Sequence, residues 1–283
     1  MNYQWFPGHM TKAFRMMQED IKLIDLVIEL LDARAPLASR NPDIDNLAAG
    51  KARMVLLNKA DLADEVLNEK WVKYFSGMGL TVVLINSRDG DGIKKILPAV
   101  QEACREKIER DRKRGIMNRP VRAMVAGIPN VGKSTFINSL AGRAAAKTGN
   151  KPGVTKGKQW IRLNKSIELL DTPGVLWPKF EDQDTGRRLA FLGSINDEII
   201  DKNELACELI DFIKDEGNGY AGLITGKYGV AEDKVNHQVL SDIAMVRKCL
   251  VKGGEPDTDR ASGMLIDDFR GGKLGRITLE RPV

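Results

Sequence analysis

A glycine-rich loop between a short apolar run and a helical segment constrains the fold of this chain more than any other feature. The loop reads GIPNVGKST (127–135), the run RAMVAGI leads into it, and KSTFINSLAG continues from it. Gly127, Gly132, Lys133 and Ser134 match G-x-x-x-x-G-K-[ST], in which glycines let successive backbone N–H groups converge on phosphates. The order strand, loop, helix predicts a nucleotide-binding P-loop, because the positive end of the helix then points at the phosphates.

Five short apolar runs indicate the strands of one sheet. Each is rich in β-branched residues or leucine, and helical stretches lie between several of them. This alternation predicts an α/β fold with a mostly parallel sheet covered on both faces, whose functional loops lie at the carboxyl ends of the strands. The predicted strands are 25–33, 53–59, 81–87, 122–128 and 166–172, and the predicted helices are about 43–50, 64–78, 91–113 and 133–141.

The P-loop residues have distinct expected roles. Lys133 is placed to reach the β and γ phosphates, and the Ser134 hydroxyl supplies an oxygen to Mg²⁺. The residues of this loop expected to contact the nucleotide are Asn130, Val131, Gly132, Lys133, Ser134 and Thr135.

A second motif, DTPG from Asp171 to Gly174, follows the apolar run SIELLD. Asp171 is expected to hold Mg²⁺ through a water, and the Gly174 N–H to bond the γ-phosphate. Between the P-loop and this motif lies NKPGVTKGKQW (150–160). Its Thr155 is the expected second Mg²⁺ ligand, because the PGVT turn presents the hydroxyl, and Thr148 is the competing candidate.

The tetrapeptide NKAD (58–61) is typical of a guanine-binding loop. Asp61 can accept hydrogen bonds from N1–H and the 2-amino group of guanine, whereas adenine offers neither donor on that edge and leaves the carboxylate unpaired. Lys59 is expected over the base plane, and Asn58 is expected to tie neighbouring loops together. The other interpretation makes Asp61 the N-cap of the helix at 64.

A third loop, at Asn86 and Ser87, follows the next apolar run, and the Ser87 N–H is the expected donor to guanine O6. Both base-binding loops precede the P-loop, whereas an ordinary GTP-binding domain has its P-loop first. Rejoining a compact domain at adjacent termini keeps every spatial neighbour. The order therefore predicts a circularly permuted GTPase domain. Its second switch, the DTPG motif at 171–174, then runs directly into the domain that follows.

The chain changes character after about residue 179. Val235, Val239, Ile243, Val246 and Leu250 recur with the spacing of one face of an amphipathic helix. We therefore expect two domains, a GTPase domain at 1–178 and a small, mainly helical domain at 179–283.

Composition places the protein among soluble globular chains. The net charge of +5 and the pI of about 9.0 weakly favour an acidic partner such as nucleic acid. Cys104, Cys207 and Cys249 form no CxxC pair, which is typical of a reducing compartment rather than of zinc sites or disulfides. Because we find neither an apolar signal region nor a membrane-spanning run, we expect a cytoplasmic monomer that contacts no membrane.

Taken together, these motifs resemble those of the bacterial ribosome biogenesis GTPase A family. The resemblance includes the permuted order and the segments WFPGHM (5–10), DARAPLASRNP (32–42), NKADL, GIPNVGKST, PGVT, DTPGVLWPK and LAFLGSI (189–195). It is dense over the GTPase half and reaches the start of the helical half. It implies a factor that binds GTP and GDP, acts late in assembly of the large ribosomal subunit, binds ribosomal RNA, and hydrolyses GTP faster on the subunit.

The catalytic group is not the usual one. Many GTPases have a glutamine after the D-x-x-G glycine to orient the attacking water, but Val175 stands there. The resemblance implies that His9 orients the water instead, since imidazole can bond a water near neutral pH. The alternative is that His9 only caps the segment before a helix. Asn130 resembles the asparagine of potassium-activated GTPases, which implies K⁺ on the phosphates, where an arginine finger would otherwise lie. An ordinary turn asparagine is the other interpretation.

Basic segments are the expected RNA contacts. KTGNKPGVTKGKQW (147–160) and RGGKLGR (270–276) are the favoured ones, while 105–122 is equally typical of a solvated helix. The helical domain is expected to face RNA or the ribosome, with a ribosomal protein as an alternative partner. Two other functions stay open at this point: a non-catalytic guanine-nucleotide switch, and a GTPase that serves RNA modification or metal transport.

Overall fold

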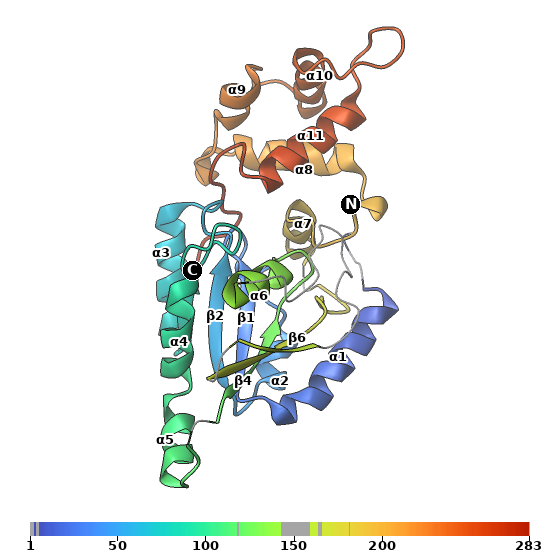
Figure 1. Ribbon diagram of the computed structural model, residues 1–283. Helices are drawn as coiled ribbons and strands as arrows, with labels where there is room; N and C mark the ends of the chain where they lie inside the picture. The colour runs from blue at the N-terminus through green and yellow to red at the C-terminus, as the bar shows by residue number, and fades with distance from the viewer. Residues whose placement is uncertain are drawn as a thin grey trace. The chain divides into compact units, whose positions relative to one another are not determined.

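The computed structural model describes residues 3, 6–117, 119–142, 159–163, 166–180 and 182–282 (Figure 1). The chain forms two compact units: a sheet unit of residues 4–181 and 278–283, and a helical unit of residues 1–3 and 182–277. This division differs from the predicted 1–178 and 179–283 at both ends of the chain. Tyr3 is buried in the helical unit, where its hydroxyl donates to Glu208 at 2.5 Å, and the last residues pack with the sheet unit.

The sheet has six strands in the order β3-β2-β1-β4-β6-β5. All neighbouring pairs are parallel except β5 and β6, so the predicted mostly parallel α/β fold is confirmed. β5 was not predicted, because it is a four-residue edge strand that begins at the end of the segment 150–160, in which we expected a loop presenting Thr155. The strands are β1 (Leu26–Asp32), β2 (Ala52–Asn58), β3 (Thr81–Leu84), β4 (Val121–Ala126), β5 (Gln159–Arg162) and β6 (Ile167–Asp171).

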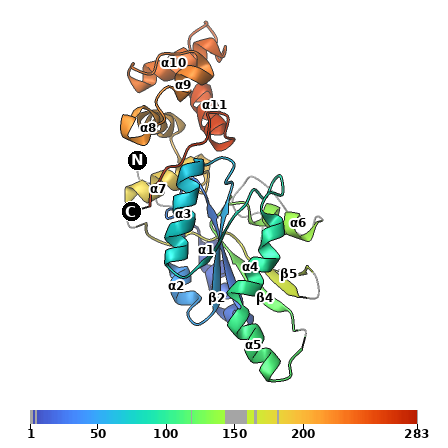
Figure 2. The same ribbon diagram turned by 90° about the vertical axis from the view of Figure 1, so that its left-hand side faces the viewer.

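Helices cover both faces of this sheet. α1 (Gly8–Asp20), α2 (Asp43–Leu47) and α3 (Glu65–Gly77) lie on one face, and α4 (Ile96–Ala103) and α6 (Lys133–Ala141) lie on the other (Figure 2). The predicted helix 91–113 is divided into the 3-10 turn η2 (Ile93–Lys95), α4 and α5 (Arg105–Lys113). Cys104, between the two α-helices, has φ −102° and ψ 10°, which breaks the helical geometry. A further 3-10 turn, η1 (Ile21–Leu23), follows α1.

The core of the sheet unit contains a cluster of large apolar side chains under α3. β1 is buried at all seven positions, as a strand covered on both faces requires. Trp71 and Phe75 of α3 are fully buried and stack on each other with ring centroids 5.8 Å apart. α3 begins at a cap, because the Asp64 carboxylate accepts a hydrogen bond from the Leu67 N–H at 2.8 Å.

The helical unit consists of α7 (Gln183–Phe191), α8 (Lys202–Lys214), α9 (Leu223–Tyr228), α10 (Asn236–Val246) and α11 (Thr258–Arg270), with the 3-10 turns η3 (Asp197–Ile199) and η4 (Glu216–Asn218). The apolar stripe predicted around α10 is only half buried. Val239 and Ile243 lie in the core, but Val235 and Leu250 fall outside the helix and are exposed. Among the described residues, no helix combines the length and apolar character needed to cross a membrane.

We expect Trp71→Ala to lower the free energy of unfolding by about 3–5 kcal/mol, since it removes a fully buried aromatic side chain and leaves a cavity. Val66→Ala on the same helix is the control; Val66 is 62% exposed, and the expected loss is below about 0.5 kcal/mol. Denaturant unfolding followed by circular dichroism measures both. Equal losses for the two variants would contradict the packing described for α3.

Candidate nucleotide site

The sequence motifs meet at the carboxyl ends of the strands, because the strands that carry them are parallel neighbours. Asp32, at the end of β1, pairs in register with Asn58, at the end of β2, and Asp171 of β6 pairs with Val125 of β4. The P-loop leaves β4 at this same end of the sheet (Figure 1). The swapped order of the motifs along the chain therefore does not separate them in space.

The P-loop is packed too closely for side chains at its glycines. Gly132 has φ 99°, and a Cβ there would lie 2.5 Å from the amide nitrogen of Asn58. A Cβ at Gly127 would lie 2.7 Å from the carbonyl oxygen of Leu30. Because α6 begins at Lys133, directly after this loop, backbone N–H groups and the positive end of the helix point into one anion site.

Lys133 is a buried cation within this site. Its Nζ donates to the carbonyl oxygens of Gly127 and Ile128, both at 3.0 Å. Burial lowers the pKa of Lys133 to about 8, and the nearby carboxylate of Asp171 opposes this shift. Bound phosphates would add the negative charge that a buried ammonium needs.

Asp171 offers a carboxylate oxygen for a metal ion. Burial raises the pKa of Asp171 to about 6, against the effect of Lys133. Its Oδ1 is buried and has no hydrogen-bond partner among the described residues. A buried oxygen without a partner is costly unless a ligand satisfies it, and a carboxylate with the hydroxyl of Ser134, in the first turn of α6, is a donor set that suits Mg²⁺.

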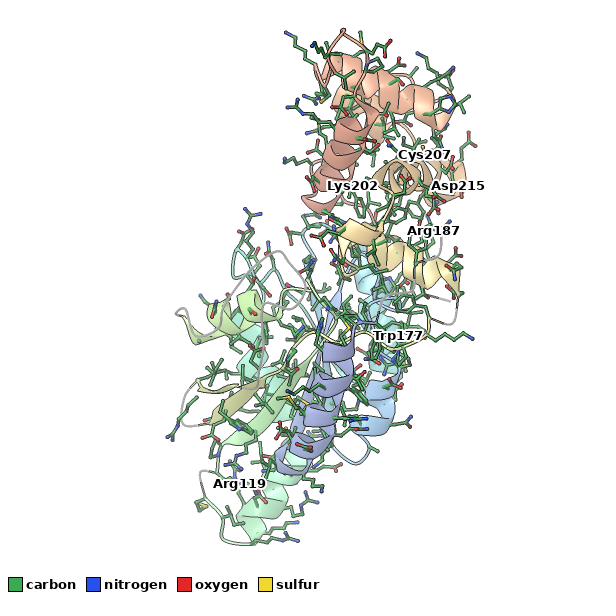
Figure 3. All side chains as sticks on the ribbon, turned by 90° about the vertical axis from the view of Figure 1, so that its right-hand side faces the viewer. Arg119, Trp177, Arg187, Lys202, Cys207 and Asp215 are labelled. Carbon is green, nitrogen blue, oxygen red and sulfur yellow. The ribbon has the colours of Figure 1, made fainter. Side chains whose placement is uncertain are left out.

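The segment after Asp171 passes directly beside the P-loop. A Cβ at Gly174 would lie 2.8 Å from the backbone nitrogen of Pro129, and the Val175 N–H donates to the Gly127 carbonyl at 3.2 Å. The Val175 side chain is buried. Further along, Trp177, labelled in Figure 3, is also buried. It packs edge-on against Phe180, with ring centroids 5.2 Å apart.

Asn58 connects the three loops of the site. Its side-chain amide donates to the Val131 carbonyl of the P-loop at 2.8 Å. Its side-chain oxygen accepts from the Ser87 N–H at 3.1 Å and from the Ser87 hydroxyl at 2.8 Å. The P-loop, the NKAD loop and the loop at 87 are therefore fixed relative to one another by one buried side chain.

Lys59 is held by a carboxylate that our reading of the sequence did not assign. The Lys59 Nζ donates to Asp32 Oδ2 and to the Asn130 carbonyl, both at 2.9 Å. Asp32 is 1% exposed and also accepts two hydrogen bonds from the Arg34 guanidinium. Burial would raise the pKa of Asp32, but Arg34 and Lys59 outweigh it and hold the pKa well below its usual range. In the sequence, only the motif DAR at 32–34, directly after the first predicted strand, could have indicated this contact between Asp32 and Lys59.

Two further residues, Asp61 and Asn86, were predicted to bind the base. Asp61 has an exposed side chain, and the N-cap of α3 is Asp64, so the cap interpretation of Asp61 is wrong. The side-chain oxygen of Asn86 accepts from the N–H groups of Arg88 and Asp89, which fixes the turn after β3.

The remaining predicted residues make fewer of the contacts described above, or lie outside the described residues. His9 is exposed in the first turn of α1, and the following residue, Met10, is buried with its sulfur 3.5 Å from the Leu176 N–H. Thr135 is half-buried in α6. Thr155, Thr148 and the basic stretch 147–158 lie outside the described residues.

The predicted RNA-contacting segment RGGKLGR (270–276) begins at the last residue of α11, and part of its charge is paired within the helical unit. The Arg270 guanidinium pairs with the Asp197 carboxylate at 2.7 and 2.8 Å and donates to the carbonyls of Ala190 and Phe191. Lys273 lies 3.2 Å from Asp268. Arg270 and Lys273 therefore contribute to the fold of the helical unit, which local composition cannot reveal, whereas Arg276 is exposed.

A phosphate-binding loop tied through Asn58 to an NKxD loop, at the carboxyl edge of a parallel sheet, is the arrangement of a P-loop GTPase. Here the motifs follow one another in circularly permuted order.

Comparison with known proteins narrows this class. A family model described as 50S ribosome-binding GTPase matches residues 122–242. Ribosome biogenesis GTPase A of Bacillus cereus is 47% identical over 283 residues, covering 100% of this chain and 95% of that protein, and that of Thermotoga maritima is 33% identical, covering 98% and 94%. The GDP-bound structure of TM YlqF matches with a TM-score of 0.67 and 29% identity, covering 95% of this chain and 99% of that chain. The chain belongs to the ribosome biogenesis GTPase A family and is a GTP-hydrolysing enzyme.

We expect GDP binding to take up protons at pH 8.5–9. The free protein has a Lys133 pKa of about 8, and phosphates that offset its burial raise this pKa, so binding recharges the lysine. Titration calorimetry in buffers of different ionisation enthalpy measures the uptake. At pH 7 the lysine is largely charged in both states and the uptake should be small. A binding enthalpy independent of the buffer at pH 9 would contradict a recharged Lys133.

We expect Asp61→Asn to weaken GTP binding about 100-fold or more and to improve binding of xanthosine triphosphate, because an amide can donate to the 2-oxo group of xanthine. Competition against fluorescent GDP measures both ligands. The control is Asp233→Asn, an exposed carboxylate of the helical unit. Unchanged guanine preference in Asp61→Asn would remove Asp61 from the base site.

Proposed function

We propose that this GTPase acts in late maturation of the large ribosomal subunit, where it binds the precursor particle and its GTP hydrolysis is stimulated by that particle. The observation that carries the proposal is the 47% identity, over the whole length, to a ribosome biogenesis GTPase A. The matching family model is described as a 50S ribosome-binding GTPase, which names the same partner.

The nucleotide is bound at both ends in this proposal. The base lies against Lys59, Asp61, Asn86 and Ser87, and Asn58 keeps that pocket at a fixed distance from the P-loop. The phosphates lie in the P-loop against Lys133 and the Gly174 N–H, with the other contacts given by Asn130, Val131, Gly132, Ser134 and Thr135. Guanine is selected because its N1–H and 2-amino donors match the Asp61 carboxylate.

Mg²⁺ would be held by Ser134, Asp171 and Thr155, together with the nucleotide. When bound, Mg²⁺ offsets the negative charge of the β and γ phosphates. We further propose K⁺ near Asn130. Asn130 has φ 58° and its carbonyl accepts from Lys59, so the loop is held in a fixed conformation beside the phosphate site. A cation there would stabilise charge that develops between the two phosphates.

His9 is our candidate for the group that positions the attacking water. Val175 occupies the usual position of a glutamine but is apolar and buried, and its N–H is bonded to the P-loop. His9 precedes Met10, which contacts Leu176 one residue after Val175. The imidazole thus belongs to a helix whose next residue contacts the segment after the D-x-x-G motif, and we propose that movement of this helix on the ribosome brings the imidazole to the γ-phosphate.

RNA contact is proposed at basic segments. The two favoured ones are 147–160 and 270–276, in the second of which Arg276 is exposed. A third candidate is the end of α5 and the residues after it, where Arg110, Arg112, Lys113 and Arg114 are exposed. Nearer the body of the sheet unit, Lys107 is paired with Asp111 at 2.7 Å, so only the far end of this segment offers positive charge to phosphates.

Sedimentation tests the partner. We expect the protein with a non-hydrolysable GTP analogue to migrate with large-subunit precursors and to migrate less with GDP. Mature small subunits are the control particle. Absence of co-migration with large subunits in both nucleotide states would overturn the ribosomal role without affecting the GTPase assignment.

Turnover on purified large subunits tests the catalytic proposal. We expect His9→Ala to lower the stimulated kcat about 100-fold or more while the affinity for GTP stays the same, because only transition-state positioning is lost. His237→Ala, the other histidine of the chain, is the control. The same assay in sodium instead of potassium buffer tests the K⁺ site. If the subunit does not stimulate hydrolysis and His9→Ala is silent, the protein is better described as a nucleotide switch.

A further inference from the structure

The last residues of the chain form a buried strap on the sheet unit. We call residues 278–282 the C-terminal strap. Thr278, Leu279 and Glu280 are 3%, 3% and 7% exposed. The strap follows directly after the helical unit, which ends at residue 277.

The strap holds the loop that follows β1. The Leu279 N–H donates to the Arg34 carbonyl at 2.6 Å. The Glu280 carboxylate accepts from the N–H groups of Leu37 and Ala38, at 2.7 and 2.9 Å. A carboxylate that satisfies two adjacent N–H groups of a tight turn is a strong, charge-assisted anchor, and its loss leaves both donors unpaired.

This loop in turn orients the guanine side of the site. Arg34 pairs with Asp32 through two hydrogen bonds of 2.9 Å, and Asp32 accepts from the Lys59 Nζ, which also bonds the Asn130 carbonyl of the P-loop. The position of Lys59 over the base therefore depends on Asp32 and on the backbone that presents Arg34.

The strap also contacts the other side of the guanine-binding loop. The Thr278 hydroxyl accepts from the Asp64 N–H at 2.9 Å, and Asp64 is the N-cap of α3. Only Leu62 and Ala63 separate this residue from Asp61. The strap is thus bonded both to the loop that orients Lys59 and to the start of the helix that follows Asp61.

We propose that the C-terminal strap is a positioning element of the guanine-binding loop and sets the rate at which the nucleotide leaves. Thr278 and Glu280 are positioning residues that act through Asp64 and through the loop at 34–38. The inference rests on the proposed base-binding role of Lys59 and Asp61, and it needs no ribosomal partner.

The strap gives the helical unit a further covalent connection to the sheet unit, besides those at residues 3–4 and 181–182. The chain enters the helical unit at residue 182, after the second switch, and leaves it at residue 277, immediately before the strap. A partner that binds the helical unit and pulls on its last residues would act on the base-binding loop through the backbone itself.

Release of fluorescent GDP from the purified full-length protein tests the proposal. We expect Thr278→Val and Glu280→Ala each to accelerate GDP dissociation about five- to tenfold, the effect of losing one or two buried hydrogen bonds. Glu255→Ala removes an exposed carboxylate of the helical unit and should leave the rate unchanged. Unchanged GDP dissociation in both strap variants would overturn the proposal.

A second ligand separates positioning from general loss of structure. Magnesium pyrophosphate occupies only the phosphate side, so its inhibition constant against GTP hydrolysis should stay within about twofold of the unaltered protein in both variants. Equal weakening of pyrophosphate and GDP would also overturn the proposal, since it would show that the strap only supports the fold. If the unaltered protein does not prefer GDP to ADP, the base-site assignment itself is wrong, which is a different outcome.

Discussion

The buried side chain of Asn58 is the contact on which the nucleotide site depends. Its amide nitrogen reaches the Val131 carbonyl of the P-loop and its amide oxygen holds Ser87, so three loops from three strands share one pair of atoms. This contact also requires a glycine at 132, since a Cβ there would lie 2.5 Å from the side-chain nitrogen of Asn58. A GTPase must hold its base-binding and phosphate-binding loops at the separation that matches GTP. The hydrogen bonds of Asn58 fix this separation before the nucleotide binds.

Two buried charges prepare the phosphate side for its ligand. Burial shifts the pKa of Lys133 downward to about 8 and that of Asp171 upward to about 6, so each group is less stable in its charged form than it would be in water. Bound phosphates and Mg²⁺ would oppose both shifts, because they would supply the opposite charges that the protein lacks there. Binding of the complete magnesium nucleotide would then relieve a cost that the folded protein already carries.

Circular permutation explains why the chain ends lie where they do. The second switch at 171–174 leads into the helical unit, and the chain returns to the sheet unit only for the strap at 278–282. At the other end, Tyr3 is buried in the helical unit, six residues before His9 in the sheet unit. The two units are consequently connected by the chain at three places: one shortly before His9, one after the D-x-x-G motif, and one at the start of the C-terminal strap. Chain connections of this kind suit a protein in which binding of a partner to one unit regulates the other.

The sequence by itself determined the P-loop, the D-x-x-G and NKxD motifs, the parallel sheet and the permuted order. Each of these depends on local backbone geometry and on strand periodicity, which a few adjacent residues specify. Only the tertiary structure decided that Asp32 holds Lys59, that Arg270 pairs with Asp197, and that Glu280 anchors a turn 243 residues away. These contacts join residues that are far apart in the chain, or side chains whose direction depends on packing, and hydrogen bonds of that kind leave no periodic trace in the sequence. The helical unit was the least predictable part, because the partners of its basic residues, such as Asp197 for Arg270, come from other segments of the chain.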